Sequence, residues 1–424
     1  MKVLVVGSGG REHALVWKLS QSRRVEKIYA APGNGGMKDL AETVNIKESN
    51  TVELAVFAQK EKIDLTVVGP EMSLALGIVD EFSKKNLKIF GPNQRASVIE
   101  SSKAFAKEFM KKNNIPTAGF NVFDSAIGAI NHIKTAPFPL VIKADGLAGG
   151  KGVFICQNLR QAEESIRIIM LENKFGKSGE QVVIEEFLKG QEMSFMAIAD
   201  GKRVIPLATS MDYKRAEEND RGPNTGGMGA ISPAPDISRD LYNTIMNTII
   251  LPTIEGLKFD GKEFRGLLYA GLMITRIGPM VLEYNVRFGD PETQAVLMRM
   301  KSDLVDLLEG SADGNLFDIP VEWSDEVSGC VVLTSKGYPG KFEIGKMIEG
   351  VKRAKAMGVE VFHAGTVLKS DGYYSTGGRV LNVCARGTTL KDTMKRIYDA
   401  ISFISFDNMN FRQDIGRKKS SEGK

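Results

Sequence analysis

The chain has 424 residues, of which 42% are hydrophobic and 25% are charged, and its net charge is +4 at neutral pH. This composition is typical of a globular protein with about three domains, and the charge is too small to indicate a nucleic-acid partner. The three cysteines lie far apart and there are only three histidines, which argues against a disulfide framework, a cysteine-based zinc site and a histidine-rich metal site. No apolar run approaches the ~20 residues of a membrane span, so we expect a cytoplasmic protein without a membrane partner.

Residues 1–103 alternate between predicted strands and predicted helices. Such a rhythm predicts a parallel sheet with helices on both faces. We expect strands at residues 2–6, 27–31, 65–68 and 88–90, and helices at residues 12–21, 51–60 and 76–85. A further helix at 101–113 leads from this first domain into a linker, which we place at residues 104–122.

The pattern changes in the middle of the chain, where neighbouring strands are predicted to pair as hairpins. We expect strands at 140–144, 153–156 and 181–187, a helix at 159–171, and hairpins formed by 193–199 with 203–209 and by 267–274 with 279–285. Residues 328–424 contain short β-rich segments, a last helix at 389–403 and a basic end at 417–419 that we expect to be disordered. The predicted class is a multidomain α/β and α+β protein with a small C-terminal β-rich domain.

The second strand of the last hairpin carries the most informative polar residues. Alternation along a strand places Glu283, Asn285 and Arg287 on one face, with Val281 on that face and Val286 on the other. Mg²⁺ or Mn²⁺ prefers oxygen ligands such as Glu283 and Asn285, and Arg287 would neutralise a transferring phosphoryl group. The alternative is a half-buried strand with a structural ion pair.

A glycine-rich loop follows the strand that carries Lys143. Gly149, Gly150 and Gly152 let backbone N–H groups approach phosphate oxygens, and Lys151 and Lys143 add positive charge. The loop is not a Walker A motif, because Lys151 is followed by glycine and no helix is expected there. The alternative is a plain hairpin turn.

The strand at 181–187 ends in two adjacent carboxylates, Glu185 and Glu186, followed by Phe187 and Leu188. Adjacent side chains point to opposite faces of a strand, so at most one of the two carboxylates faces a ligand. The segment suits a hinge whose backbone pairs with an adenine edge, while Glu192 accepts hydrogen bonds from ribose hydroxyls. We therefore include these five residues in a candidate nucleotide site.

A long polar, glycine-rich connection begins at Asp212. Connections of this length are uncommon in compact domains unless they are functional or disordered. We count Asp212 and Lys214 among the candidate catalytic residues, and Gly226 and Gly227 among the candidate substrate-binding residues.

The first strand leads through a glycine-rich turn into a helix, an arrangement that binds anions. The dinucleotide-binding fingerprint requires a third glycine where this chain has Glu12, so a nicotinamide cofactor is disfavoured and a sugar phosphate is favoured. A tight strand-to-helix turn without a ligand is the alternative. The candidate phosphate-binding residues are Gly7, Gly9, Gly10 and Arg11.

Taken together, these motifs resemble those of the phosphoribosylamine–glycine ligases, ATP-grasp enzymes of purine synthesis. The resemblance extends over nearly the whole chain. Its motifs lie at residues 7–13, 31–34, 68–71, 89–92, 102–105, 141–146, 222–229, 268–271 and 287–292.

The resemblance implies an ATP-grasp fold with a lid at 123–192 and a core at 193–327, followed by a C-terminal domain at 328–424. It implies Lys103, Lys143 and Lys151 as nucleotide contacts, residues 185–188 as the adenine hinge, and Glu283 with Asn285 as metal ligands. We expect the 5′-phosphate of the substrate at the first turn and its ribose hydroxyls at Glu71, at the end of the third strand.

The implied reaction uses ATP to convert glycine to glycyl phosphate, which the amine of 5-phosphoribosylamine attacks to give glycinamide ribonucleotide, ADP and phosphate. We expect a monomer. Another ATP-grasp ligase of purine synthesis and a catalytically silent nucleotide-binding protein are the alternatives. The chain departs from the family at Gly149, Met211, Tyr213 and Val286, which leaves the roles of Met211 and Tyr213 open.

Overall fold

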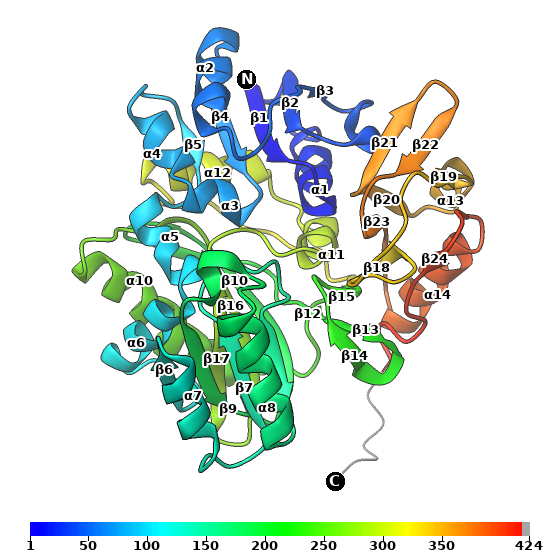
Figure 1. The fold of residues 1–424 in the computed structure, drawn as a ribbon. Helices are drawn as coiled ribbons and strands as arrows, with labels where there is room; N and C mark the ends of the chain where they lie inside the picture. The colour runs from blue at the N-terminus through cyan, green and yellow to red at the C-terminus, as the bar shows by residue number, and fades with distance from the viewer. Residues whose placement is uncertain (418–424) are drawn as a thin grey trace.

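The computed structural model describes residues 1–417 and combines one parallel sheet with several antiparallel sheets (Figure 1). The predicted mixture of α/β and α+β architecture is confirmed. Residues 418 and 419, which belong to the basic end expected to be disordered, lie outside the described residues. Within residues 1–417, no helix combines the length and the apolar character required to cross a membrane.

The N-terminal sheet has the strand order β3-β2-β1-β4-β5, and all its neighbours are parallel. From Val3 onward its central strand is buried on both faces: Leu4 and Val6 pack in one hydrophobic core, and Val3 and Val5 pack in another. A parallel sheet covered on both faces requires such a continuous apolar run. The strands are β1 (Lys2–Gly7), β2 (Lys27–Pro32), β3 (Glu42–Thr43), β4 (Leu65–Val68) and β5 (Ile89–Phe90).

The helices of this region are α1 (Gly10–Leu19), α2 (Thr51–Glu61), α3 (Glu71–Ala75), α4 (Ile78–Ser83) and α5 (Gln94–Ser101). The prediction of a single helix at 76–85 is wrong in its bounds: the structure has two shorter helices, α3 and α4, over residues 71–83. Gly77 adopts a left-handed conformation with φ +81° and separates α3 from α4. As a result, α3 begins directly at Glu71, at the carboxyl edge of the sheet.

A second sheet, β6-β9-β7-β8, follows helix α6 (Lys103–Lys112) and is antiparallel throughout. Its strands are β6 (Phe120–Phe123), β7 (Leu140–Ala144), β8 (Val153–Cys156) and β9 (Val182–Glu186). Helices α7 (Ala126–Ile133) and α8 (Leu159–Ile166), the latter extended by a π-helical turn at Arg167–Leu171, pack on it. This sheet has a small hydrophobic core of its own, which contains Ile142, Ile166 and Ile184.

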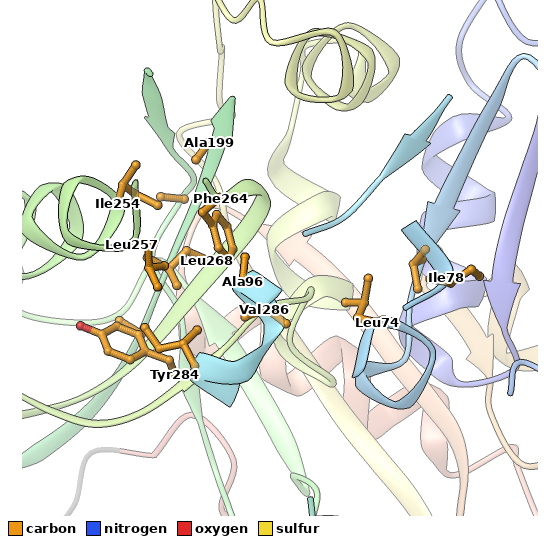
Figure 2. Packing of buried hydrophobic residues seen from close by; sticks show 14 of the residues in the cluster. Leu74, Ile78, Ala96, Ala199, Ile254, Leu257, Phe264, Leu268, Tyr284 and Val286 are labelled. Atoms are coloured by element: carbon orange, nitrogen blue, oxygen red, sulfur yellow. The ribbon is translucent and has the colours of Figure 1, made fainter. Parts of the chain in front are cut away.

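The third sheet, β11-β10-β16-β17, contains the two predicted hairpins. Its strands are β10 (Gln191–Asp200), β11 (Val204–Pro206), β16 (Arg265–Thr275) and β17 (Gly278–Asn285). One face of this sheet packs on α5, on α9 (Arg239–Ile245) and on α10 (Leu251–Phe259). Helices α9 and α10 were not predicted. Figure 2 shows Tyr284 and Val286 among the buried side chains of this core, with Leu268 and Ala96.

The C-terminal sheet includes two strands from the middle of the chain. Its order is β12-β15-β18-β23-β20, so β15 (Gly229–Ser232) pairs with β18 (Val327–Ser335) and β12 (Met211–Asp212) lies at one edge. The remaining elements include α11 (Glu292–Arg299), α12 (Leu304–Asp313), β20 (Glu360–His363), β21 (Thr366–Lys369), β22 (Gly372–Ser375), β23 (Arg379–Gly387) and α14 (Leu390–Ile401). The helix predicted at 389–403 is therefore confirmed as α14.

Candidate active site

A β-bulge in β17 determines which side chains reach the site. Gly271 of β16 is paired with Glu283, whereas the next residue, Leu272, is paired with Val281, so Leu282 is an extra residue in β17. An extra residue reverses the alternation of side chains along the strand. Val281 therefore lies in the hydrophobic core, and the prediction that it shares a face with Glu283 is wrong.

Beyond the bulge, regular alternation resumes. Tyr284 and Val286 enter the same core as Val281, while Glu283, Asn285 and Arg287 lie on the opposite face. The departure from the family at Val286 is thus in the core. The three polar residues of the strand face one site, as their spacing predicts.

Glu283 is paired with a lysine from the long polar connection. Nζ of Lys214 lies 3.1 Å from Oε1 of Glu283. The charge of Lys214 lowers the pKa of Glu283 to about 2 against the effect of burial, with Lys143 and Lys103 acting in the same direction. Burial opposes a charged Lys214, but Glu283 and three further neighbours (Tyr269, Glu192 and Asp212) together outweigh it and raise the pKa of the ammonium well above its usual range. This half-buried carboxylate therefore stays ionised at neutral pH.

Arg287 is held by side-chain oxygens of three residues and by the carbonyl of Phe288, 3.3 Å away. Its guanidinium lies 3.2 Å from Glu71, 3.4 Å from Glu100 and 3.0 Å from Oδ1 of Asn285. Burial raises the pKa of Glu71, but Arg287 and Arg11 outweigh it and lower that pKa to about 2. Both carboxylates thus orient one guanidinium, and sequence patterns did not reveal Glu100.

Glu100 is almost completely buried at the end of α5. Its Oε2 accepts a hydrogen bond of 2.7 Å from the backbone N–H of Val286. Burial raises the pKa of Glu100 to about 7, although Arg287 lowers it in part. Glu100 therefore anchors the backbone of β17 as well as Arg287.

A buried ion-pair network supports the predicted nucleotide lysines. Glu185 lies 2.9 Å from Nζ of Lys143 and 2.9 Å from Nζ of Lys107, a residue that the sequence patterns did not reveal. Lys143 also donates to the carbonyl of Leu282 at the bulge, over 2.9 Å. Burial lowers the pKa of Lys107 to about 8, against the pull of Glu185. The network joins α6, β7, β9 and β17 at the site.

The two adjacent carboxylates of β9 point in opposite directions, as predicted. Glu185 points inward, whereas Glu186 is exposed and accepts a hydrogen bond from the N–H of Gly119 over 2.8 Å. Phe187 and Leu188 follow at the end of the strand and are half-buried. The backbone of this segment thus runs beside the buried lysines.

The glycine-rich loop is a turn with open surroundings. Gly149 and Gly150 have φ values of +57° and +73°, which favour glycine, and Lys151 donates its N–H to Ala148. No heavy atom lies within 4 Å of a Cβ built at Gly149, whereas one at Gly152 would meet Ala148 at 2.8 Å. The loop therefore leaves backbone open at Gly149.

Lys103 lies next to this loop. Its Nζ donates to the carbonyls of Asp145 and Gly146 over 3.3 and 2.9 Å. Burial lowers its pKa, while Glu283 and Asp145 raise it. Lys103, Lys143 and Glu283 are therefore brought together, whereas Lys151 is exposed.

Asp212 and Lys214 project from the same side of their segment. Tyr213 between them is buried in the C-terminal core, where its hydroxyl accepts the N–H of Gly416 over 3.0 Å. Alternation turns its two neighbours to the other side, where Lys214 reaches Glu283. Met211 packs against two hydrophobic cores. Both departures from the family, at Met211 and Tyr213, thus have packing roles.

Gly226, one of the two predicted substrate glycines, is held by Tyr338, which follows β18, and by Arg379, the first residue of β23. Tyr338 accepts the N–H of Gly226 over 3.0 Å, and Arg379 donates to the carbonyl of Gly226 over 2.6 Å. Gly227 has φ +113°, and a Cβ there would lie 2.3 Å from Pro291. The close approach requires glycine, and the contributions of Tyr338 and Arg379 were not predicted.

The first turn is occupied by carboxylates. Glu12 accepts the N–H of Gly9 over 2.6 Å and Nε of Arg11 over 2.5 Å, and Asp290 accepts the N–H of Arg11 over 3.4 Å. Two carboxylates at a helix N-terminus disfavour a phosphate dianion at the same N–H groups. Side chains built at Gly7 and Gly10 would collide with neighbours at 2.6 and 2.2 Å. Packing in a tight turn therefore explains these glycines.

A cavity of about 380 Å³ lies beside this turn. It is open to solvent on one side and is bordered by the ends of β1 and β2, by Asp290 and by the C-terminal sheets. Its lining residues are Ser8, Gly9, Pro32, Gly33, Asn34, Asp290, Ala364, Gly365, Thr366, Thr376 and Arg379.

Comparisons with known proteins cover nearly the whole chain. Residues 1–100, 101–293 and 328–418 match, respectively, the N domain, the ATP-grasp (A) domain and the C domain of phosphoribosylglycinamide synthetase. The phosphoribosylamine–glycine ligase of Clostridium acetobutylicum is 48% identical over 419 residues, which are 99% of this chain and 100% of that protein.

The same enzyme of Caldanaerobacter subterraneus subsp. tengcongensis is 49% identical over 415 residues, 98% of this chain and 99% of that protein. The crystal structure of phosphoribosylamine–glycine ligase from Thermotoga maritima superposes with a TM-score of 0.86 at 33% identity. The superposition covers 98% of this chain and 100% of that one.

Proposed function

This chain belongs to the phosphoribosylamine–glycine ligase family, and we propose that it joins glycine to 5-phosphoribosylamine with ATP. The carboxylate of glycine attacks the γ-phosphorus of ATP, which releases ADP and forms glycyl phosphate. The amine of phosphoribosylamine then attacks the acyl carbon, loses a proton and displaces phosphate, which gives glycinamide ribonucleotide. The observation that carries the proposal is the family match over nearly the whole chain, which includes the polar face of β17.

The chemistry asks for positioning and charge neutralisation rather than for a side-chain nucleophile. We propose that Lys103, Lys143 and Lys151 bind the phosphates of ATP, with N–H groups of the 149–152 turn. The open backbone at Gly149 supports this assignment. The backbone of residues 185–188 would bind adenine, and Glu192 would bind ribose.

A divalent cation fits Glu283 and Asn285, because both present oxygen ligands on the phosphate side of β17. We propose Mg²⁺, or Mn²⁺ in its place. Among residues 1–417 there is no group of three or more His, Cys, Asp or Glu side chains arranged for a metal. Such a cation, when bound, would neutralise phosphate charge. Arg287, held by Glu71 and Glu100, would face the transferred phosphoryl group.

We propose that phosphoribosylamine enters the cavity beside Gly9. The polar lining of this cavity suits a ribose phosphate, and Arg379 supplies a cation there. Gly226 borders the same region through Arg379, and Gly227 lies against the carbonyl of Asp290. Glu71 remains our proposed partner for ribose hydroxyls, whereas Arg11 would act through its contacts with Glu12 and Asp290.

We further propose five segments: an N-terminal domain at 1–103, a linker at 104–122, an ATP-grasp lid at 123–192, a core at 193–327 and a C-terminal domain at 328–424. The separate hydrophobic core around β7 and β9 supports the lid. We also propose a cytoplasmic monomer that acts without nucleic acid or membrane.

An isotope experiment tests the acyl phosphate. Glycine labelled with ¹⁸O in its carboxylate should transfer labelled oxygen to the released phosphate, because that oxygen bridges carbon and phosphorus in the intermediate. Unlabelled phosphate would rule the mechanism out. Phosphate release measured with a panel of amino acids and with freshly generated phosphoribosylamine tests the substrates, and activity with another amine or acid in place of this pair would redirect the assignment.

A further inference from the structure

Arg412 is a buried charge that the proposed reaction does not use. Its side chain is 2% exposed and is among the largest that are fully buried in residues 1–417. Its Nε and Nη2 atoms each donate to Asp414 over 2.7 Å, so the guanidinium and this carboxylate form a bidentate pair. Two residues this close in sequence can pair equally well at the surface, and burying an ion pair costs free energy. The buried position therefore indicates a further role.

The third nitrogen of the guanidinium, Nη1, reaches the long polar connection in the middle of the chain. It donates to the carbonyl of Arg215 and to Oδ1 of Asp220, over 3.0 Å in both cases. The guanidinium carbon also lies 5.3 Å from the centre of the Tyr213 ring, which is within the range of a cation–π contact. Arg412 thus contacts the residues on both sides of Lys214.

This part of the polar connection is a short hairpin that depends on outside contacts for its position. Its strands are β13 (Arg215–Glu217) and β14 (Arg221–Asn224), which pair with a register shift (Figure 1). A single two-stranded hairpin is marginally stable by itself. The partner of Arg412 adds a second contact, because Asp414 accepts the N–H of Asn219 over 2.8 Å. The guanidinium and its partner carboxylate therefore both hold the hairpin.

Lys214 links the position of the hairpin to the candidate site. Its Nζ lies 3.1 Å from Oε1 of Glu283. The stem of a lysine side chain is flexible, so the place of its ammonium depends on where its backbone is held. Thr225 holds this backbone on one side, since its N–H and its hydroxyl both donate to the carbonyl of Lys214 over 2.8 Å. Arg412 holds the neighbouring residues on the other side.

We propose that Arg412 is a positioning residue of the ligase reaction, which holds the hairpin so that Lys214 stays paired with Glu283. This inference rests on the proposed function, in which Glu283 binds the divalent cation. The contacts of Arg412 are with the hairpin and the C-terminal segment rather than with the lid lysines proposed to bind ATP. Arg412 therefore acts on phosphoryl transfer and not on the binding of ATP.

The test measures kcat and the KM for ATP in the full-length protein. Arg412→Met removes the hydrogen bonds of the guanidinium but keeps a long side chain. It should lower kcat by about 10- to 100-fold, as expected when a catalytic group is displaced by about 1 Å, and leave the KM for ATP little changed. Arg396→Met makes the same change at an exposed position of α14, and this matched control should retain the kcat of wild type.

A double-mutant cycle with Lys214→Met tests the route of the effect. If Arg412 acts through Lys214, the two substitutions together should lower kcat no more than Lys214→Met alone does. Single-turnover phosphate release extends the measurement to slow variants. Asp220→Ala removes an acceptor on the hairpin and leaves the pair with Asp414 in place, so it should lower kcat by a smaller factor. It replaces Arg412→Met in the cycle if that protein folds poorly.

Losses in kcat that multiply in the double variant would overturn the proposal, because Arg412 and Lys214 would then act independently. A wild-type kcat in both Arg412→Met and Asp220→Ala would also overturn it, as would a KM for ATP that rises in proportion to the loss in kcat. In each case, formation of glycinamide ribonucleotide by the wild-type protein would leave the proposed function intact. If wild type forms no product, the proposed function fails, and the positioning role fails with it.

Discussion

Glu100→Gln should make the protein more stable at alkaline pH. Burial raises the pKa of Glu100 from 4.5 to about 7, so the folded state binds its proton more tightly than the unfolded state does. Folding stability due to this group is therefore present below pH 4.5 and is lost as pH rises toward 7. Because one pKa unit corresponds to about 1.36 kcal/mol, ionisation of Glu100 lowers the unfolding free energy by about 3 kcal/mol.

Gln at position 100 does not titrate, and its amide oxygen still accepts the N–H of Val286. The difference in unfolding free energy between variant and wild type should rise by about 3 kcal/mol between pH 4.5 and pH 8. Comparing the two proteins at each pH cancels the titration of other groups, including His13 and His363, whose pKa values burial lowers. Urea unfolding followed at several pH values measures this difference.

The same substitution should reduce turnover, because Arg287 loses one of its two carboxylate partners. A gain in stability together with a loss of activity is expected where a charged group is retained for function. A pH-independent difference in stability would refute the reasoning, since it would mean that Glu100 titrates alike in the folded and unfolded states. Unchanged kcat would show that Glu71 alone orients the guanidinium.

Three further predictions concern the nucleotide and metal region. Glu283→Gln should nearly abolish phosphate release. It should also lower the melting temperature, because Lys214 is left without its ion-pair partner. Near-normal turnover at saturating Mg²⁺ would contradict the assignment of Glu283 as a metal ligand. Lys107→Met should weaken ATP binding measured by calorimetry. It should also lower the unfolding free energy by about 3–5 kcal/mol, since it breaks a buried ion pair with Glu185. Unchanged affinity and stability would show that Lys143 alone is a sufficient ion-pair partner for Glu185. Hydrogen exchange at residues 145–152 should slow when Mg-ATP binds, because phosphates supply contacts that the open turn lacks, and an unchanged rate would argue against a closing lid.

Local patterns predicted the parts of the fold that depend on neighbours in sequence. The hairpins of the third sheet and helix α14 were found because their residues pair or pack over short separations. The two-residue strand β12 and the four-residue strand β15 were not predicted, since their partners come from elsewhere in the chain. Helices α9 and α10 were also not predicted.

The residues of the candidate site divide in the same way, into those that local patterns predict and those that depend on distant partners. The spacing of Glu283, Asn285 and Arg287 predicted a shared polar face, but Val281 was misplaced because a bulge depends on the pairing with β16. Glu100 and Lys107 were missed because their partners are distant in sequence and a lone Glu or Lys has no distinctive pattern. Such residues are found only once the fold brings the charges together.

The shared C-terminal sheet has a consequence for how the protein is made. Strand β15 ends at Ser232, whereas its partner β18 begins at Val327, so the ribosome releases β15 long before β18 exists. During that interval, β15 has an unpaired edge, and unpaired edges template association between nascent chains. A gene truncated before β18 would therefore yield an aggregating product rather than a smaller nucleotide-binding protein.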